Sequence, residues 1–414
     1  MKRGFWALLL CAWLSPGIES ASAEVRHVYL TWQSDPSTTM SVHVQTRQRA
    51  NSTTPTISVV YDTVEAGTPS DYRWRAPASR VDAMEAVPGR TVHSVELTDL
   101  LPGRRYYYRV LSSMDAASTV RHFRTVSASP EPLRFIVGGD MGTELLSRRL
   151  QKAAAAQQPQ FAVIGGDVAY ANGDWAQIAI WDQWFDNWDS LMVSPTGDQI
   201  PIVAAIGNHE VRGEYGGRPQ DAGPYLRLLP QSPTTYYERT FGPHVAMLVL
   251  DSGHIERHGG RQAAWLADAL QRHDPRRFLM AVYHVPLFPG FRQPSGAMSR
   301  AGRQHWQPLF DQHAISVAFE HHDHMFKRSV LIRGDREAAD GVLYLGDGAF
   351  GRGPRMVDGP RQVHLARRWY LDRIESRGHI WRVDIDAAAD SVVFTAIDAE
   401  GEEFDRVVRP ARAR

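Results

Sequence analysis

The chain has 414 residues, which is long for a single hydrophobic core, so two domains are expected. Its 46 Lys and Arg residues balance 46 Asp and Glu residues, and no stripe of basic residues interleaves with aromatic ones. This composition does not favour a nucleic-acid-binding protein.

The first 23 residues have the pattern of an export signal. Lys2 and Arg3 precede an apolar run over 5–14, and residues 21–23 (Ala-Ser-Ala) form a small-residue cleavage site. The apolar run is too short to span a bilayer. We therefore predict a secreted or periplasmic protein cleaved near Ala23. The only cysteine, Cys11, lies inside the run, so the mature chain is expected to have no disulfide.

Residues 24–127 are predicted to be an all-β domain. Short runs that alternate apolar and polar residues, such as 25–32 and 40–45, are separated by Asp, Pro, Ser and Gly clusters. The stretch 97–103, followed by three tyrosines at 106–108, resembles the late strands of a fibronectin type III-like sandwich, where a tyrosine locks a corner. A scaffold role is expected, with docking to a cell wall or a partner as the alternative.

The composition changes after a linker at 127–132. Strands alternate with helices over 132–414, as in a layered α/β domain. Helices are predicted over 144–156, with Thr143 as the N-cap, and over 261–272.

Two other features of this domain carry predictions. Two loops rich in Gly and Pro, 212–224 and 286–300, are expected to rim a site. Four tryptophans predict a buried helix face, with a wall that stacks substrate as the alternative; they are Trp175, Trp181, Trp184 and Trp188.

Five apolar runs in this domain end in the same way, with a metal-binding type of side chain just beyond the strand. The predicted strands are 133–137, 161–164, 202–206, 278–283 and 315–319. The side chains that follow them are Asp140, Asp167, Asn208, His284, and His322 with His324. Because ligands collect outside the carboxyl ends of strands in open α/β sheets, we expect these side chains to converge.

The residue types favour a pair of metal ions. Carboxylate and phenol oxygens, such as those of Asp167 and Tyr170, suit hard cations, whereas imidazoles suit borderline first-row metals. His322 and His324 are two residues apart, so on an extended backbone they would point to one face. Each would meet a different ion of a close pair if a shared group, Asp167, bridges the two.

The ordered turns resemble the five signature blocks of the purple acid phosphatases, which are binuclear metallophosphoesterases. The matching segments cover roughly residues 132–330 and are Gly139-Asp140-x-Gly142, Gly166-Asp167-x-x-Tyr170, Gly207-Asn208-His209-Glu210, Val282-x-His284 and His322-x-His324. Tyr170 is the discriminating position, because metallophosphoesterases outside this group generally lack a tyrosine ligand there. The resemblance implies a fibronectin type III-like sandwich (24–127) followed by a calcineurin-like domain (132–414), in which helices flank two central β-sheets.

The resemblance also implies a ligand set for each metal. One ion would be held by Asp140, Asp167, Tyr170 and His324. The second would be held by Asp167, Asn208, His284 and His322. Three potential anions in the first set favour Fe(III), whereas the neutral ligands of the second suit Zn, Mn or Fe(II).

The implied function is that of an exported acid phosphatase acting on phosphate monoesters, which are small-molecule substrates. His209 is expected to steady the transition state or to protonate the leaving oxygen, with a purely structural imidazole as the alternative. The alternatives to this function are a phosphodiesterase or phytase at the same site, or a non-catalytic cell-surface binding protein.

The sequence departs from the family pattern at two places. Glu320-His321 stands where a glycine usually precedes the paired histidines, and no histidine follows His284 within 285–292. His321 or Arg292 is expected to take the place of the missing phosphate-facing groups.

Overall fold

The computed structural model describes residues 23–48, 53–346, 348–357, 368–386 and 390–412. Residues 1–22 of the predicted export signal (1–23) therefore lie outside the described residues. No helix in the described part of the chain combines the length and apolar character that crossing a membrane requires.

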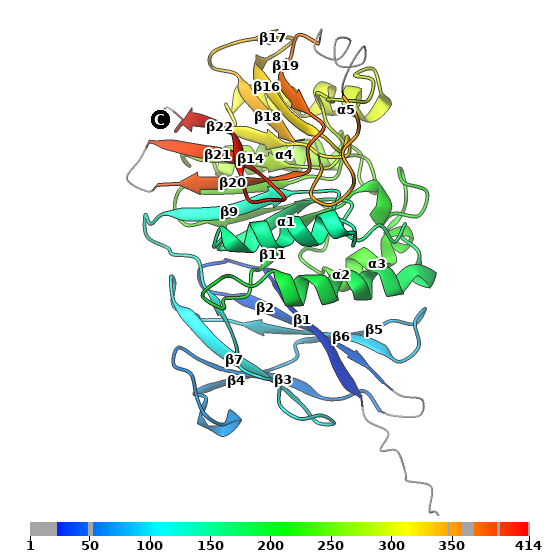
Figure 1. Cartoon of the computed structure of the whole chain (residues 1–414), viewed down its shortest axis with the longest axis vertical. Coiled ribbons are helices and arrows are strands. Elements are labelled where there is room, and N and C mark those ends of the chain that lie inside the picture. Colours follow the sequence, from blue (N-terminus) through cyan, green and yellow to red (C-terminus); the bar gives the residue numbers. More distant parts are fainter. Residues whose placement is uncertain (1–22, 49–52, 347, 358–367, 387–389, 413–414) are drawn as a thin grey trace, which may run out of the picture.

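The N-terminal part is a sandwich of two four-stranded antiparallel sheets (Figure 1). The first sheet has the order β1-β2-β6-β5 and the second β4-β3-β7-β8. The strands are β1 (Glu24–Thr31), β2 (Met40–Arg47), β3 (Ile57–Asp62), β4 (Trp74–Pro77), β5 (Arg80–Ala83), β6 (Arg90–Leu97), β7 (Arg105–Ser112) and β8 (Arg121–Arg124). The expected tyrosine contact is present, because the Leu101 N–H donates to the Tyr106 hydroxyl at 2.8 Å.

The second part contains two mixed sheets. A six-stranded sheet has the order β11-β10-β9-β20-β21-β22, in which β9, β10 and β11 are parallel. Its strands are β9 (Leu133–Gly138), β10 (Phe161–Gly165), β11 (Ile202–Ala205), β20 (His379–Ile385), β21 (Ser391–Asp398) and β22 (Glu403–Pro410). Strand β10, which precedes Asp167, lies between its two parallel neighbours.

The other sheet has eight strands in the order β12-β13-β14-β15-β18-β16-β17, with β19 paired to β16. Its strands are β12 (Tyr237–Phe241), β13 (Val245–Val249), β14 (Phe278–Val282), β15 (Val317–Phe319), β16 (Phe326–Arg333), β17 (Arg336–Glu337), β18 (Val342–Gly346) and β19 (Leu371–Glu375). Strands β13, β14, β15 and β18 are parallel. The five strands predicted to deliver ligands are all present, as β9, β10, β11, β14 and β15.

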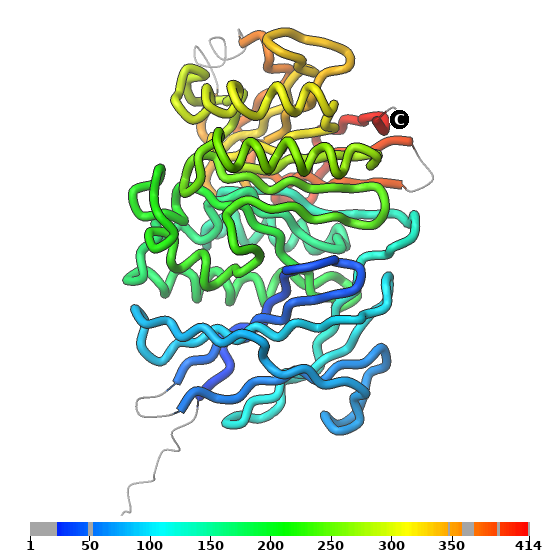
Figure 2. Tube along the Cα trace, turned by 180° about the vertical axis from the view of Figure 1, so that it is seen from behind, coloured from blue at the N-terminus to red at the C-terminus, as the bar shows by residue number. Residues whose placement is uncertain are grey.

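Helices cover the outer faces of the two sheets, as Figures 1 and 2 show. The helices are α1 (Leu145–Ala156), α2 (Ile178–Leu191), α3 (Gly223–Leu228), α4 (Arg261–Arg272), α5 (Ala297–His305) and α6 (Gln307–Gln312). Helices α1 to α3 pack on the six-stranded sheet, whereas α4 and α6 pack on the eight-stranded one and α5 packs against α6. The apolar core between the sheets includes Phe135, Val163, Met280 and Phe319, all fully buried. The expectation of two central sheets flanked by helices is confirmed.

Helix α2 of the second part packs against the sandwich. Trp181, Trp184 and Trp188 are buried in it, which confirms the buried helix face and leaves no stacking surface on these three rings. The Tyr29 ring of the sandwich lies 4.4 Å from that of Phe185 on the same helix. The tryptophans therefore fill the core rather than a binding site.

Two local predictions met different outcomes. Helix α4 spans the predicted residues 261–272. Helix α1 begins at Leu145, and its N-cap is Glu144 rather than Thr143, because Glu144 keeps an extended backbone (φ −68°, ψ 170°).

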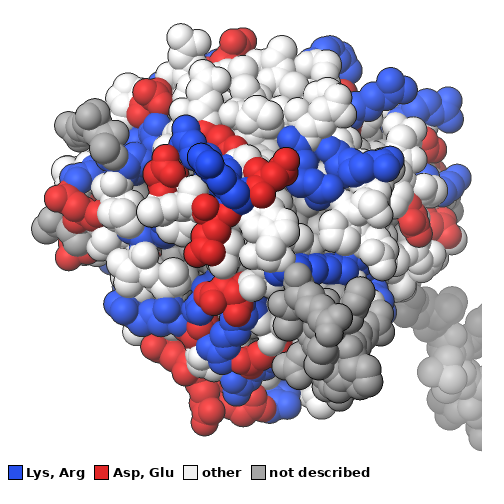
Figure 3. Space-filling view, turned by 90° about the horizontal axis from the view of Figure 1, so that it is seen from above, with Lys and Arg blue, Asp and Glu red and all other residues white. Residues whose placement is uncertain are grey.

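The end of the molecule far from the sandwich has a mixed surface. In Figure 3 the basic and acidic side chains on this face are interspersed rather than segregated. This agrees with the balanced composition, and this face carries no large field of one sign.

Candidate metal centre

The carboxyl ends of strands from both sheets meet at one place. Strands β9, β10 and β11 lead into the turns with Asp140, Asp167 and Asn208, and β14 and β15 lead into the histidines of the other sheet. All seven predicted ligand side chains come together there. Asp140 and Asp167 are almost fully buried, so their charges need compensation.

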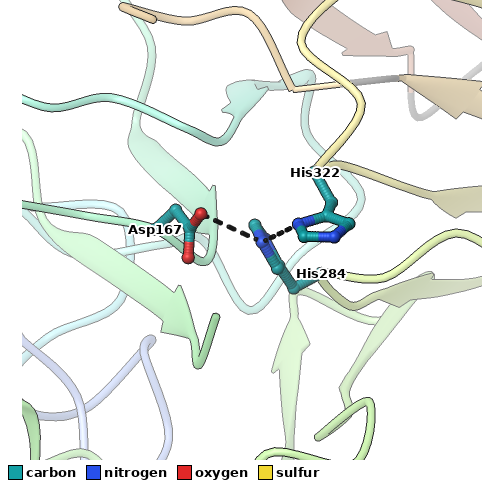
Figure 4. Close-up of side chains that lie close together, drawn as sticks. All are labelled: Asp167, His284 and His322. Carbon is teal, nitrogen blue, oxygen red and sulfur yellow. Dashed lines mark hydrogen bonds and ion pairs between the residues drawn. The ribbon is translucent and has the colours of Figure 1, made fainter. Parts of the chain in front are cut away.

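One group of donor atoms surrounds Nε2 of His284. This atom lies 3.2 Å from Asp167 Oδ2, 3.1 Å from Asn208 Oδ1 and 3.1 Å from His322 Nδ1. Figure 4 shows the Asp167 carboxylate and the two imidazoles pointing toward one another. The group contains one anion and three neutral donors.

A second group forms around Asp140. Its Oδ1 lies 2.9 Å from His324 Nε2 and 3.1 Å from the Tyr170 hydroxyl. The Tyr170 hydroxyl lies 3.1 Å from the same nitrogen of His324. Asp167 has donor atoms within 4.8 Å of those of Asp140 and His324, and likewise of those of His284 and His322, so it is shared by the two groups.

The spacing of these atoms suits metal ions. Ligand atoms about 2.0–2.1 Å from a tetrahedral ion lie roughly 3.3 Å apart, close to the separations observed here. The donor types also fit, because the groups combine carboxylate, phenol, amide and imidazole. The residues present can therefore hold two cations that share Asp167.

Backbone strain is concentrated in these turns. Five of the ten non-glycine residues with positive φ in the described part of the chain belong to the predicted ligand set. They are Asp140, Asp167, Tyr170, His322 and His324. Each such conformation costs about 1–3 kcal/mol, so the surrounding structure must hold it in place. The paired histidines therefore do not lie on an extended backbone, so the prediction that His322 and His324 point to one face of a strand is wrong.

Gly166 is required beside Asp167. Its φ is +90°, and a Cβ atom there would lie 2.8 Å from His284 Nδ1 and 2.9 Å from the Gly207 backbone. Only glycine leaves room for the His284 ring and the adjacent turn at this point.

A buried carboxylate, Glu210, holds two of the turns together. Its oxygens accept hydrogen bonds from the backbone N–H groups of Asp167 (2.7 Å), Val168 (2.8 Å) and Gly207 (2.8 Å). Burial, and then the charge of Asp167, raises the pKa of Glu210 to about 8. Glu210 ends the Gly207-Asn208-His209-Glu210 motif, which by itself did not indicate this role.

The second nitrogen of His284 fixes the orientation of its ring. Nδ1 lies 3.0 Å from the carbonyl oxygen of Gly165, to which it donates. Nε2 is thereby left to face the other ligands, an arrangement typical of metal-binding histidines.

The carboxylates control the electrostatics of the site. Burial by itself would raise the pKa of the Asp167 carboxyl, but the charge and hydrogen bond of His284 outweigh it and hold that pKa far below its usual value. Burial would lower the pKa of His284, but Asp167 and Asp140 raise it to about 9. Burial, followed by the same two carboxylates, raises the pKa of Tyr170 well above its ordinary value. The site thus favours cations, which are what a phenolate at Tyr170 would require.

His209 lies at the mouth of the site with its side chain 32% exposed. Its backbone N–H donates to Asp167 Oδ1 at 2.9 Å, its ring lies 4.3 Å from that of Tyr170, and Nδ1 contacts the Asn172 side chain. Burial lowers the pKa of His209 despite the nearby charge of Asp167.

The two residues expected to face phosphate have different surroundings. His321 is 1% exposed, and Cβ atoms at Gly139 or Gly165 would lie within 3 Å of its ring. The imidazole therefore fills the space that two glycines leave behind the turns, and contact with substrate is not supported. Arg292 is partly exposed, and its guanidinium donates to the carbonyl of His322 at 2.9 Å, beside Asp323 at 3.3 Å.

Both predicted loops reach the site. Arg292 comes from the second loop, and Tyr215 comes from the first. The Tyr215 hydroxyl lies 3.3 Å from Nε2 of His322, on the side of the ring opposite Nδ1. No sequence motif includes Tyr215, so its place beside His322 could not be predicted.

Family models match both parts of the chain. Residues 25–125 match the model described as purple acid phosphatase, N-terminal domain. Residues 133–326 match the model of the calcineurin-like phosphoesterases, and this span contains all seven predicted ligands.

Individual relatives are more distant. An uncharacterized protein of Mycobacterium tuberculosis is 27% identical over 281 residues, which are 59% of this chain and 51% of that protein. The probable purple acid phosphatase 20 of Arabidopsis thaliana is 24% identical over 311 residues, 70% of this chain and 68% of the relative. The chain spans about half the length of the first of these relatives.

The fold is similar to that of a solved plant enzyme. The purple acid phosphatase isolated from yellow lupin seeds superposes with a TM-score of 0.75 at 15% identity, over 94% of this chain and 75% of that one. Two family models in the same order, a shared fold and two donor groups joined by Asp167 identify the chain as a member of the purple acid phosphatase-like metallophosphoesterases.

Proposed function

We propose that this protein is a metal-dependent phosphohydrolase that cleaves phosphate monoesters at acidic to neutral pH. The observation that carries the proposal is the pair of donor groups that share the buried Asp167 carboxylate. When bound, two close metal ions lower the pKa of a water molecule and clamp phosphate oxygens for in-line attack.

The side chains around the metal ligands have separate tasks. His209, beside Asp167 and exposed at the mouth, donates a hydrogen bond or a proton to the leaving oxygen. Arg292, held by the His322 carbonyl and Asp323, attracts the phosphate by its charge. Glu210 keeps the Asp167 and Gly207 turns in register through its three backbone hydrogen bonds.

The charges of the two groups support different ions. Asp140, Asp167 and Tyr170 offer three potential anions, which favours Fe(III). His284, His322 and Asn208 add only neutral donors to the shared carboxylate, which suits Zn, Mn or Fe(II). A phenolate on Fe(III) absorbs visible light, so the loaded protein should be coloured.

Metal removal and replacement test the proposal. Chelated protein should lose hydrolysis of p-nitrophenyl phosphate, and iron with zinc or manganese should restore activity together with a visible band. The variant Tyr170→Phe should lose the band, whereas Tyr107→Phe in the sandwich should keep it. Full activity in the metal-free protein would overturn the proposal, and an unchanged band in Tyr170→Phe would overturn phenolate ligation.

The same measurements address the alternatives. Faster cleavage of bis-p-nitrophenyl phosphate or phytate than of simple monoesters would assign the site to diesters or phytate. Absence of metal-dependent hydrolysis in the fully loaded protein would favour a cell-surface binding protein.

Export belongs to the same proposal. The pattern of residues 1–23 supports secretion or transfer to a periplasm, after which the mature chain would begin near Glu24. Mass spectrometry of the protein recovered from the medium or periplasm tests the cleavage position.

A further inference from the structure

A cavity of about 200 Å³ lies between the sandwich and the start of helix α2, which packs beside β1 (Figure 1). The lining residues used below are Arg26, Gln45, Arg47, Arg90 and Asp182, and none of the predicted metal ligands lines the cavity. Its volume is below the roughly 300–1,000 Å³ of sites for organic ligands, so it suits a small ion.

The lining has more positive than negative charge. Three arginines face one carboxylate, Asp182, which lies 2.5 Å from Arg90 and offsets its charge. Within the part of the chain that the structure describes, Arg26 and Arg47 form no ion pair and no side-chain hydrogen bond. A guanidinium group stays protonated in proteins. Two positive charges at this cavity are therefore without a counter-ion.

The register of the first sheet brings the arginines together. Arg47 on β2 is the direct partner of Arg90 on β6, and like charges directly opposite each other destabilise a sheet. Arg26 is the extra residue of a β-bulge on the edge strand β1, between Val25 and His27. Bulges redirect side chains at sheet edges and beside functional sites. An anion between these guanidinium groups would relieve their repulsion.

Gln45 offers a buried donor to the same cavity. Its side chain is 1% exposed, and its Oε1 accepts a hydrogen bond from Arg90. Exchange of the amide oxygen and nitrogen would place two donors against each other, so the contact with Arg90 fixes the orientation. Among the described residues, Nε2 of Gln45 has no hydrogen-bond partner. Because an unsatisfied buried donor is unfavourable, this group points to an acceptor in the cavity.

The donors favour a phosphate over a carboxylate. The guanidinium fork matches both anions. However, the forks of Arg26 and Arg47 and the amide of Gln45 together offer more donors than the two oxygens of a carboxylate can satisfy. A phosphate group has further oxygens, and its charge of up to about −2 at neutral pH balances the two unpaired arginines.

We propose that this cavity is a second anion site, which binds inorganic phosphate between the sandwich and the metal-binding domain. The site is separate from the metal centre and does not depend on the proposed phosphohydrolase function. Bound phosphate links Arg26 and Arg47 of the sandwich to the start of α2, and it stabilises the folded chain because the unfolded chain lacks the site.

Titration of metal-free protein with inorganic phosphate tests the site. Without cations, the buried carboxylates of Asp140 and Asp167 repel an anion at the metal centre. The double variant Arg26→Gln/Arg47→Gln keeps polar side chains but removes both charges, and calorimetry compares its phosphate affinity with that of the wild type. Arg300→Gln is the matched control, because Arg300 is exposed on α5 and does not line the cavity.

The double variant should bind phosphate about 10-fold or more weakly, because charge-assisted contacts are lost. Arg300→Gln should bind as the wild type does. Phosphate should also raise the thermal unfolding midpoint of the wild type more than that of the double variant. Comparison at equal phosphate concentration removes the general effect of the salt. Equal affinities in the wild type and the double variant, or no binding to the wild type, would overturn the proposal.

Two further measurements locate the anion and identify its class. Arg292→Gln alters the metal-centre side of the molecule and should leave the phosphate affinity of the metal-free protein unchanged. A loss of affinity in Arg292→Gln instead of the double variant would place the phosphate at the metal centre and overturn the second site. Acetate should displace phosphate weakly, and displacement by acetate as effective as that by sulfate would overturn the assignment to a phosphate-like anion.

Discussion

Buried histidines occur in both parts of the molecule, and their surroundings differ. In the sandwich, His43 is fully buried between the hydroxyls of Thr31 and Ser94, at 2.7 and 2.9 Å. In the second part, His284 is equally buried but lies 3.2 Å from the Asp167 carboxylate.

The partners decide the direction in which the pKa of each ring shifts. Burial lowers the pKa of His43 to about 3, and that of His93 in the same sheet to about 4. For His284, Asp167 and Asp140 overcome the effect of burial and raise the pKa to about 9. Burial alone therefore does not mark a functional histidine; a buried carboxylate beside it, at the end of a parallel strand, does.

Removing the charge of Asp167, which both donor groups share, should have the largest effect on metal content and activity. Asp167→Asn should lose both metals together and lower kcat/KM by about 10³-fold or more, because one group serves both ions. Metal analysis and steady-state kinetics measure the two effects. Asp268→Asn, on the exposed face of α4, is the control, and full metal content in Asp167→Asn would contradict the bridging role.

Loss of the His209 imidazole, at the mouth of the site, should affect catalysis but not metal binding. His209→Ala should lower kcat by about 10²–10⁴-fold while leaving the metal content near that of the wild type. The control is His313→Ala, beyond the end of α6. Wild-type turnover in His209→Ala would reduce His209 to a packing residue.

A smaller effect on metal affinity is expected from Tyr215, which contacts the outer nitrogen of His322. Tyr215→Phe keeps the ring but removes the hydroxyl that faces Nε2, so metal affinity should fall about 10–100-fold. Competition with a chelator measures this change. Tyr107→Phe is a matched control, because Tyr107 also lies beside a histidine, at 5.3 Å from His122, but in the sandwich. Equal metal affinities in the two variants would show that the hydroxyl does not orient His322.

The buried histidines of the sandwich should make the stability of the folded protein depend on pH. Burial holds the pKa of His43 near 3 in the folded protein, below the ordinary 6.5. The unfolded chain binds a proton at this residue below pH 6.5 and the folded chain does not, so stability falls as pH falls through this window. His43→Gln should reduce that dependence by up to about 1.4 kcal/mol per pH unit.

Urea unfolding at several pH values between about 7 and 4.5 tests this expectation with metal-free protein, so that ligand binding does not contribute. His313→Gln is the control for a histidine outside the sandwich. An unchanged pH dependence in His43→Gln would mean that the unfolded and folded states protonate His43 alike.

Much of the site followed from the order of residues along the chain. An apolar run of strand length followed by Gly and then Asp, Asn or His places a polar side chain at a strand end, because the strand stops where the side chains stop being apolar. Three turns follow this pattern, and in two more an apolar run leads to His284 or to His322 and His324 without a glycine. The five turns together predicted convergence at the carboxyl edge of the sheets, and the structure brings those side chains together.

Other features could not be predicted from local patterns. Glu210 acts on backbone N–H groups of Asp167 and Val168, about 40 residues away in the chain, so its own neighbours gave no signal. His321 looked like a phosphate-facing group because it adjoins two predicted ligands. It is buried instead, because Gly139 and Gly165 on other strands leave the space that its ring fills.

The sequence by itself determined the two-part organisation, the strand ends and the candidate ligand side chains, because these depend on local composition and spacing. The tertiary structure decided which imidazole nitrogen faces each group, and that His321 fills the space behind the turns whereas the adjacent His322 faces the other donor atoms. Those properties depend on left-handed backbone at Asp140, Asp167, Tyr170, His322 and His324, and on contacts between loops that are distant in the chain.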